Sequence, residues 1–401
     1  MSWEKIRFSD IYSENSKNGI SVNKAQHNGT VKIVNMGELF ANDFIGDIDM
    51  RRIKVEDTQL RRFSLTEGDL LFARRSLVAE GAGKVAMVES VTEPTVFESS
   101  IIRVRLDPRR ALPRFYEYWF NSFEGHDAIA RLITGTNVKG VRSSELRNIT
   151  VPLPPLNVQQ GIAGILFTYD KLIENNRKQI KLLEETAQRL YKEWFVDLHF
   201  PGHETTPIHN GVPEGWERTT VGKICELIRD SSRPDDRNES TMYIGLEHMP
   251  KNSICLNMYG DVSSVTGSKL NFRKNDILFG KIRPYFHKVG FAQCNGVTST
   301  DTLVMRAKPN CFGLLLEIVS SDAYVAYATA TSKTGTKMPR ADWNAMSAYE
   351  LLEPSARVLA QFDGFVKQIT DEIMNLSDQI VAAREARDRL LPKLMSGEIE
   401  V

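Results

Sequence analysis

Two long stretches of the chain repeat apolar residues at alternating intervals of four and three positions. The first stretch carries the repeat at Ile162, Leu166, Tyr169, Ile173, Asn176, Ile180, Leu183, Ala187, Leu190 and Trp194. The second carries it at Phe362, Val366, Ile369, Ile373, Leu376, Ile380, Ala383, Arg387, Leu390 and Leu394. This is the heptad spacing of a coiled coil, so each stretch predicts an amphipathic helix of about 35 residues.

A lone helix of this length would be about 50 Å long and would leave its apolar stripe in water. We therefore expect the two stripes to bury each other, although each could instead pack on its own globular domain. Since the first helix carries the chain away and the second returns it, antiparallel pairing is expected, with a globular domain at each end of a rod. Asn176 in the seam would fix the register, and Pro392 predicts an end or kink near Leu391.

The rest of the chain is a duplicated pattern of short apolar runs. SWEKIRFSDI returns as GWERTTVGKI, TEGDLLFARRS returns as RKNDILFGKIR, and TGT at Gly135 returns at Gly335. The runs KVAMVES, SIIRVRL and DTLVMRA are typical of strands. We predict an α+β fold with a pseudo-twofold internal repeat. Two mixed α/β domains, 1–158 and 199–354, are separated by an antiparallel two-helix coiled coil of residues 159–198 and 355–401.

Charge and cysteine usage narrow the class of protein. Lys and Arg together number 51, as do Asp and Glu, so any nucleic-acid surface must be local. The four cysteines form no CxxC pair, which argues against a zinc ribbon or a disulfide framework. The N-terminal sequence lacks the apolar core of a signal peptide, and no run approaches the length that spans a bilayer. We expect a cytoplasmic protein with no membrane partner.

Strings that would carry chemistry are weak or missing. EGAGKVA begins like a dinucleotide fingerprint, but a strand-like run follows it, and Lys84 precedes Val85 rather than the Ser or Thr of a phosphate loop. His199, His203 and His209 lie in a Pro- and Gly-rich connector, which favours a loop over a metal site. No glycine-rich cofactor loop with an Asn/Asp-Pro-Pro-aromatic motif occurs. We expect no catalytic centre, metal or cofactor on this chain.

The positive signal is a set of basic and aromatic residues at matching places in both halves, suited to contacting phosphates and base edges. In the first half these are Arg51, Arg52, Arg61, Arg62, Arg74, Arg75 and Lys84, with Lys139 and Arg142 after the TGT motif. In the second half they are Lys281, Arg283, Tyr285, His287 and Lys288, with Lys333, Lys337 and Arg340 around the TGT motif. We predict that they bind double-stranded DNA, although any one could be a solvated surface charge.

Two strings resemble a known family. TGTNVKGVRSSELRNITVPLPPLNVQQGI, running into the first helix and on to WFVDLHFPGHE, is similar to the central region of type I restriction-modification specificity subunits. The C-terminal RDRLLPKLMSGEIEV resembles the ending typical of that family. In the second half SAYELLEPSARVLAQF replaces the fuller Pro-Leu-Pro-Pro and Gln signature.

The resemblance implies a non-catalytic subunit with two target-recognition domains, each reading one half of a split asymmetric DNA site. The helical spacer would dock two adenine methyltransferase subunits, and restriction subunits would join through that core. S-adenosylmethionine, ATP and magnesium would then belong to the partner subunits. Two other classes remain open: a self-sufficient nuclease or methyltransferase, for which catalytic strings were not found, and a coiled-coil scaffold, which would not need duplicated domains.

Overall fold

The computed structural model describes residues 3–23, 27–76, 81–133, 139–332 and 338–401. The chain forms two compact units: Met1–Lys171 with Ala383–Val401, and Leu172–Ala382. We call them the first and the second unit. Both TGT motifs, Lys333 and Lys337 lie outside the described residues. Within the described part, no helix is both long and apolar enough to cross a membrane.

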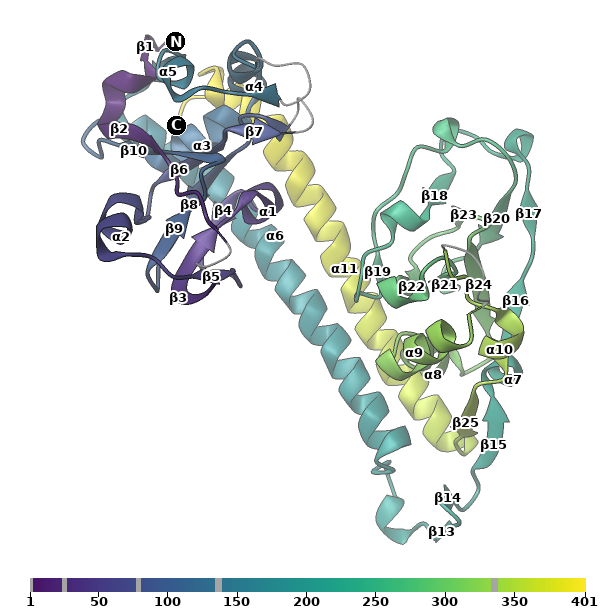
Figure 1. Cartoon of the computed structure of the whole chain (residues 1–401). Coiled ribbons are helices and arrows are strands. Elements are labelled where there is room, and N and C mark those ends of the chain that lie inside the picture. The colour runs from purple at the N-terminus through teal and green to yellow at the C-terminus, as the bar shows by residue number, and fades with distance from the viewer. Residues whose placement is uncertain (1–2, 24–26, 77–80, 134–138, 333–337) are drawn as a thin grey trace. The chain divides into compact units, whose positions relative to one another are not determined.

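The first unit is built on a mostly antiparallel sheet of order β2-β10-β6-β8-β4, in which only the β4–β8 pair is parallel (Figure 1). Its strands are β2 (Tyr12–Asn18), β10 (Ile101–Leu106), β6 (Leu70–Ala73), β8 (Val85–Val88) and β4 (Phe44–Ile45). A further sheet orders β5 (Arg52–Ile53), β3 (His27–Val34) and β9 (Thr95–Phe97), and two strand pairs join β1 (Glu4–Arg7) to β12 (Thr150–Leu153) and β7 (Arg75–Ser76) to β11 (Lys139–Gly140). The shorter helices are α1 (Met36–Ala41), α2 (Asp57–Phe63), α3 (Pro113–Asn121), α4 (Phe123–Ala130) and α5 (Ser143–Leu146).

The central strands β6 and β8 are apolar throughout because both faces of the sheet are covered there. Leu70 and Phe72 of β6 join one hydrophobic cluster, and Leu71 and Ala73 join another, as the alternation of a strand requires. The first cluster includes α3, with Phe115, and the ends of the two long helices. The sheet is therefore clamped between α3 with the long helices on one face and α1 with its neighbours on the other.

The second unit repeats this plan with the order β16-β24-β21-β22-β19, and its last pair is again parallel. Its strands are β16 (Cys225–Ile228), β24 (Thr302–Ala307), β21 (Ile277–Gly280), β22 (Val289–Ala292) and β19 (Cys255–Leu256). Around it lie the sheet β17 (Ser231–Ser232), β20 (Lys269–Phe272), β23 (Gly296–Thr298), β18 (Met242–Ile244), and the pairs β13 (Ile208–His209) with β14 (Val212–Pro213) and β15 (Glu217–Thr220) with β25 (Glu350–Glu353). The shorter helices are α7 (Val221–Ile224), α8 (Phe312–Val319), α9 (Asp322–Ala330) and α10 (Trp343–Ser347).

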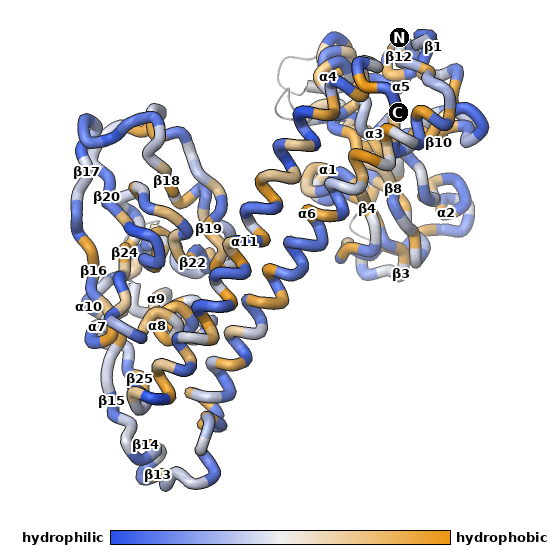
Figure 2. Tube along the Cα trace, turned by 180° about the vertical axis from the view of Figure 1, so that it is seen from behind, coloured by the Kyte–Doolittle hydropathy of each residue, from blue (hydrophilic) through white to orange (hydrophobic). Residues whose placement is uncertain are grey.

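The two long helices are α6 (Leu156–Tyr191), which continues into a π-helical turn at Lys192–Val196, and α11 (Ala356–Met395). Figure 2 shows apolar positions recurring among polar ones along both. In the first unit Asp170 of α6 meets Arg387 of α11, whereas in the second unit Asn176 meets Gln379 and Trp194 meets Phe362. As the residue number rises along α6, the number of its contact partner on α11 falls, so the helices run antiparallel. The predicted fold class, with its duplicated α/β domains and antiparallel helix pair, is confirmed.

The expectation that Pro392 ends or kinks the second helix near Leu391 is wrong about the end. Pro392 lies inside α11, which continues to Met395, and Leu394 is buried. Proline removes one backbone donor, and so close to the C-terminus it costs the helix only one bond of its final turns. The core contacts of Leu394 and Met395 in the first unit hold this last turn in place.

Candidate nucleic-acid interface

In the first unit a junction of three segments holds the basic residues that follow β6. The Arg74 N–H donates to the Ser100 carbonyl at 2.8 Å, and the Arg74 carbonyl accepts from the Val141 N–H at 3.0 Å. Arg75 and Ser76 then pair with Gly140 and Lys139. The two sequence clusters around Arg74 and Lys139, which are more than 60 residues apart in the chain, are thereby joined.

The second unit builds the same junction after β21. The Lys281 N–H donates to the Asp301 carbonyl at 2.8 Å, and the Lys281 carbonyl accepts from the Ala341 N–H at 2.9 Å. Ile282 forms a bridge with Arg340, whose guanidinium donates to an Asp301 carboxylate oxygen at 2.8 Å. The backbone scheme is therefore shared by the units, whereas the side chains on it differ.

The residues predicted to contact DNA fall into two groups by the solvent exposure of each residue. Those exposed to solvent are Arg51, Arg52, Arg61, Arg62, Arg75, Arg142, Tyr285 and Arg340. Those partly buried are Arg74, Lys84, Lys281, Arg283, His287 and Lys288. The most accessible charges of the two junctions are thus Arg75 and Arg142 in the first unit and Arg340 in the second. For Lys139, only the backbone pairing described above applies.

Several of the partly buried residues already have internal partners, Arg74 among them, which donates to the Ser99 carbonyl at 3.4 Å. Lys84 is paired with Asp43, and Lys288 donates to the Leu246 carbonyl at 2.5 Å. The His287 Nε2 contacts the Ser320 carbonyl at 2.7 Å. A DNA contact from any of them would have to replace such a bond, so these partly buried residues are weaker candidates than the exposed junction residues. Arg340 is paired too, with Asp301, but an exposed ion pair of this kind is weak and readily replaced. The role of all these residues in DNA binding stays a prediction.

The basic residues upstream of β6 belong to a different part of the first unit. Arg52 lies in β5 and pairs with Glu93 at 2.7 Å, and Arg62 of α2 stacks its guanidinium over Phe63. Hydrogen bonds from Arg52 and Lys32 lower the pKa of Glu93 to about 2. Arg51 directly precedes β5, and Arg61 lies in α2. These four arginines therefore belong to the β5-β3-β9 sheet and the helix that packs on it, whereas the junction follows β6.

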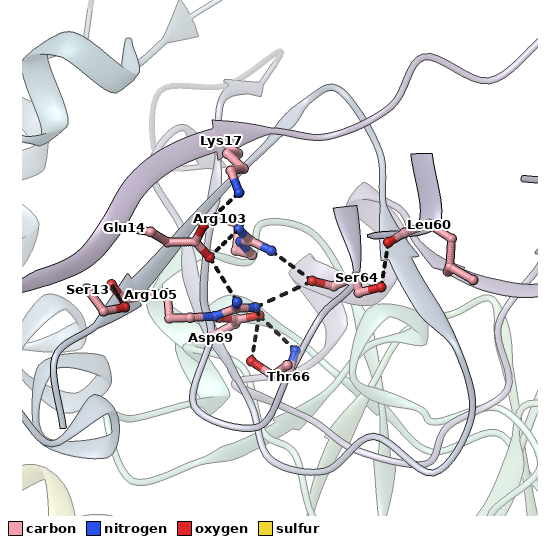
Figure 3. Close-up of polar contacts among 9 residues, drawn as sticks. All are labelled: Ser13, Glu14, Lys17, Leu60, Ser64, Thr66, Asp69, Arg103 and Arg105. Atoms are coloured by element: carbon pink, nitrogen blue, oxygen red, sulfur yellow. Dashed lines mark hydrogen bonds and ion pairs between the residues drawn. The ribbon is translucent and has the colours of Figure 1, made fainter. Parts of the chain in front are cut away.

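A polar network that sequence reasoning missed supports the strand that carries the junction (Figure 3). The buried carboxylate of Asp69 receives two hydrogen bonds from Arg105, at 2.7 and 2.8 Å, and one from the Thr66 N–H at 2.8 Å. Arg103, also buried, donates to Glu14 at 2.7 Å. Burial opposes ionisation of Glu14, but hydrogen bonding to Lys17 and the charges of Arg103 and Arg105 leave its pKa below the usual range.

The second unit repeats the core of this network. Asp276 is buried, accepts two hydrogen bonds from Arg306 at 2.8 and 2.7 Å, and caps the Arg273 N–H at 2.8 Å. Asp69 and Asp276 stand one residue before β6 and β21, so each pair fixes the start of the strand whose other end carries the junction. The signal in the sequence was an arginine at the same place in SIIRVRL and DTLVMRA.

The predicted helix seam is mostly buried. Its buried members are Ile162, Leu166, Ile173, Asn176, Ile180, Ala187, Trp194, Phe362, Val366, Ile373, Leu376, Ile380, Ala383 and Leu394. Its partly exposed members are Tyr169, Leu183, Leu190, Ile369, Arg387 and Leu390. Ile162 and Leu166 also belong to the sheet cluster of the first unit, so the helix ends pack on a globular core as well as on each other.

Each unit ties its sheet-covering helix to a long helix by a buried polar side chain. The Gln159 side chain accepts from the Leu112 N–H at 2.7 Å, just before α3. In the second unit Leu359 replaces that Gln, and the carboxylate of Asp363, one turn further along α11, accepts from the Gly313 N–H at 2.8 Å. A Cβ on Gly313 would stand 2.9 Å from the Cβ of Val366, which shows how closely α8 approaches α11.

The first half of the chain is similar to a known protein family. Residues 1–185 match the family described as type I restriction modification DNA specificity domain. The matched stretch contains the first junction, the Asp69 network and almost all of α6.

Relatives extend the likeness over the whole chain. The MjaIX specificity subunit of Methanocaldococcus jannaschii is 24% identical over 375 residues, which cover 89% of this chain and 83% of the relative. The HindI specificity subunit of Haemophilus influenzae is 20% identical over 468 aligned residues that span 99% of both chains. The family resemblance found in the sequence is therefore confirmed.

A solved structure supports the fold of the complete chain. The S subunit of the type I restriction-modification system from M. genitalium superposes with a TM-score of 0.61, covering 98% of this chain and 96% of the other at 14% identity. At that identity the likeness establishes the fold alone. The second half of the chain therefore has the specificity-subunit fold, although its own signature string departs from the first.

Proposed function

We propose that this chain is the DNA-reading subunit of a type I restriction-modification enzyme and that each unit reads one half of a bipartite asymmetric site. The observation that carries this proposal is the duplicated junction. One backbone scheme presents Arg75 and Arg142 in the first unit but Arg340 in the second. Two surfaces of one design with different side chains are suited to two different half-sites, because side chains, not backbone, distinguish base pairs in the major groove.

The paired helices are proposed to set the spacing between the half-sites and to dock two methyltransferase subunits, with restriction subunits joining through the complex. A polar contact in their seam supports a spacer of fixed length. Asn176 is buried in the seam and donates to Gln379 at 3.1 Å. A buried polar pair of this kind favours one register over others. The chain itself would have no catalytic role, and S-adenosylmethionine, ATP and magnesium would be bound by the partner subunits.

The test is DNA binding by the complete complex with Arg75→Ala and Arg340→Ala, beside Arg109→Ala as a control. Arg109 is exposed and pairs with Asp107 just after β10, at the end of that strand opposite Ser100, which contacts Arg74. An arginine that reads a guanine should lose about 1 to 3 kcal/mol and relax one base position, whereas a phosphate contact should weaken binding to all sequences and lower the salt slope by about one. Each junction variant should affect only its own half-site. Unchanged affinity and salt slope for both would remove the junctions from the interface.

A further inference from the structure

Two buried glutamates occupy equivalent positions in the two units. Glu117 of α3 and Glu317 of α8 are each about fully buried, and burial is the main cause that raises the pKa of both, that of Glu317 to about 8. Their surroundings differ. Glu117 Oε1 accepts from the Asn121 amide at 2.6 Å, while its Oε2 has no partner among the described residues. The charge of Lys84 favours the ionised form of Glu117, although that of Asp43 raises its pKa more strongly. Among the described residues, neither carboxylate oxygen of Glu317 has a hydrogen-bond partner.

Glu317 lines a cavity of about 460 Å³ within the second unit. The cavity lies between α6, which contributes Glu184 and Gln188, and the sheet-bearing part of the unit, which contributes His287, Ser320 and Asp322. The negative charge of the Glu184 carboxylate raises the pKa of Glu317 further. The cavity is thus lined by two largely buried carboxylates, and among the described residues no cation of the second unit acts on Glu317 as Lys84 acts on Glu117.

Two of the other polar side chains of the cavity wall, Glu184 and Gln188, are already engaged. Glu184 Oε1 accepts from the Ser253 hydroxyl at 2.7 Å and from the Ile254 N–H at 2.9 Å. The Gln188 amide donates to the Ser320 hydroxyl at 2.9 Å. Glu317 differs from these in having no partner within the described part of the chain, and a buried carboxylate without one is costly unless it is protonated or meets a cation.

We propose that this cavity binds an organic cation, a primary ammonium or guanidinium group, with Glu317 as its principal counter-ion and Glu184 as the second carboxylate. An ammonium carries three N–H donors and a guanidinium five, enough to satisfy both oxygens of Glu317. Because both oxygens are closed off from solvent, the wall around Glu317 must open for this contact. A divalent metal fits less well, because the described residues contain no group of three His, Cys, Asp or Glu able to ligate one. Two carboxylates also repel phosphate, so the cavity is distinct from the DNA surface.

Binding should be linked to proton release. The charged and titratable groups that line the cavity or act on Glu317 are Lys181, Glu184, Glu185 and Tyr191 of α6, His287, and Asp322 of α9. A cation requires the ionised form of Glu317, whose pKa lies at about 8. The affinity should therefore weaken about tenfold between pH 7 and pH 6.

The experiment is calorimetric titration of the full chain with 1,4-diaminobutane and with L-arginine amide, in amine-free buffers of different ionisation enthalpy. We expect a single site, release of close to one proton at pH 7, and an affinity that falls about tenfold to hundredfold in Glu317→Gln. Glu117→Gln is the matched control, since it removes the equivalent carboxylate from the first unit and should leave binding unchanged. Glu184→Gln keeps the carbonyl acceptor for Ser253 and Ile254 but loses the charge, and should weaken binding to a lesser degree.

The cation can be a free molecule or a lysine or arginine side chain of a partner subunit, and a second arm separates these sources. Association with the methyltransferase subunit is measured for wild type, Glu317→Gln and Glu117→Gln, with and without the two probes. Weaker association in Glu317→Gln alone, with competition by the probes, assigns the cation to the partner. Probe binding with unchanged association assigns it to a free molecule. This arm alone rests on the proposed function.

The proposal is overturned if neither probe binding nor subunit association depends on Glu317. It is also overturned if Glu117→Gln and Glu317→Gln have equal effects, because the cavity would then not be the site. Thermal unfolding of each variant identifies one that fails to fold. If the complete complex shows no DNA sequence specificity while the chain still binds the two probes, this result counts against the proposed function and not against the cation site.

Discussion

At the scale of single residues, the Asp69–Arg105 and Asp276–Arg306 pairs hold the starts of β6 and β21, the strands that lead into the two junctions. Asp69 is fully buried, and Arg105 closes over it with two hydrogen bonds, while the guanidinium itself stays about one-third exposed. Removing Asp69 takes away both of these bonds and leaves Arg105 paired with Glu14 alone, at 2.8 Å, and breaking a buried pair in this way costs more than the pair contributes when intact. The network therefore acts as a structural brace at the end of β6 opposite the first junction.

We expect Asp69→Ala to lower the free energy of unfolding by about 3 kcal/mol, since the carboxylate is buried and Arg105 loses both bonds. Asp127→Ala is the control, because the Asp127–Arg131 pair on α4 is exposed and should change stability by less than about 1 kcal/mol. Urea unfolding followed by intrinsic fluorescence measures both. Equal effects of the two substitutions would show that the Asp69 network is not a brace.

Glu317 gives the chain a predictable pH dependence in the absence of any ligand. Its pKa is raised from 4.5 to about 8 by burial and by Glu184. Between these values the unfolded chain releases a proton that the folded chain retains, so this residue lowers stability as the pH rises and exerts its full effect above pH 8. The slope is about 1.4 kcal/mol per pH unit at most.

Glu317→Gln should remove this slope, so the variant should match wild type near pH 5 and exceed it in unfolding free energy at pH 9. Glu372→Gln, at an exposed position of α11, should leave the profile unchanged. Unfolding midpoints at pH 5, 7 and 9 give the comparison. Parallel profiles for wild type and Glu317→Gln would mean that Glu317 is not held protonated by the fold.

At the scale of elements, α6 carries two kinds of apolar residue that the sequence pattern distinguishes. Ile173 lies in the heptad phase and is 5% exposed, whereas Leu182 lies outside the phase and is 61% exposed. Ile173→Ala should cost about 3 kcal/mol because it leaves a cavity between α6 and α11. Leu182→Ala should change stability by less than about 0.5 kcal/mol. Similar losses from both, measured by denaturant unfolding, would contradict the seam as described.

The helices and the duplication could be predicted because both are written in local or periodic patterns. Heptad spacing alone identifies Ile162 and Phe362, and the repeated strings alone match Asp69 with Asp276. The junctions could not be predicted, since Arg75 and Gly140 meet only through the order of strands in a sheet. The unpartnered state of Glu317 was equally hidden, because it depends on which side chains of α6 approach α8.

At the scale of the whole molecule, the duplication predicts what half a chain should do. Residues 1–200 contain one recognition domain and one helix whose seam lacks its partner. In a dimer of half-chains, Gln179 would stand where Gln379 stands in the full chain, so the buried contact of Asn176 could form twice across a true twofold axis. The Asp170–Arg387 pair would be lost, because Ala187 occupies the position equivalent to Arg387.

We expect the half-chain to be a dimer by light scattering, less stable than the full chain. Pairing should use Ile162, Leu166, Ile173, Ile180, Leu183 and Leu190. Charged substitutions at Ile173 and Leu183 should abolish the dimer by placing unpaired charge in the seam. A folded monomer at micromolar concentration would contradict the pairing inferred from α6 and α11.

The central claim is that each unit reads its own half of one DNA site, and methylome sequencing tests it most directly. A host carrying the full chain with its methyltransferase should show an asymmetric motif of two specified parts around an unread gap. A host carrying residues 1–200 instead should show a palindrome made of two inverted copies of one of those parts, around a similar gap. If the half-chain still modifies the original asymmetric motif, or the full chain modifies a single continuous one, the account is wrong.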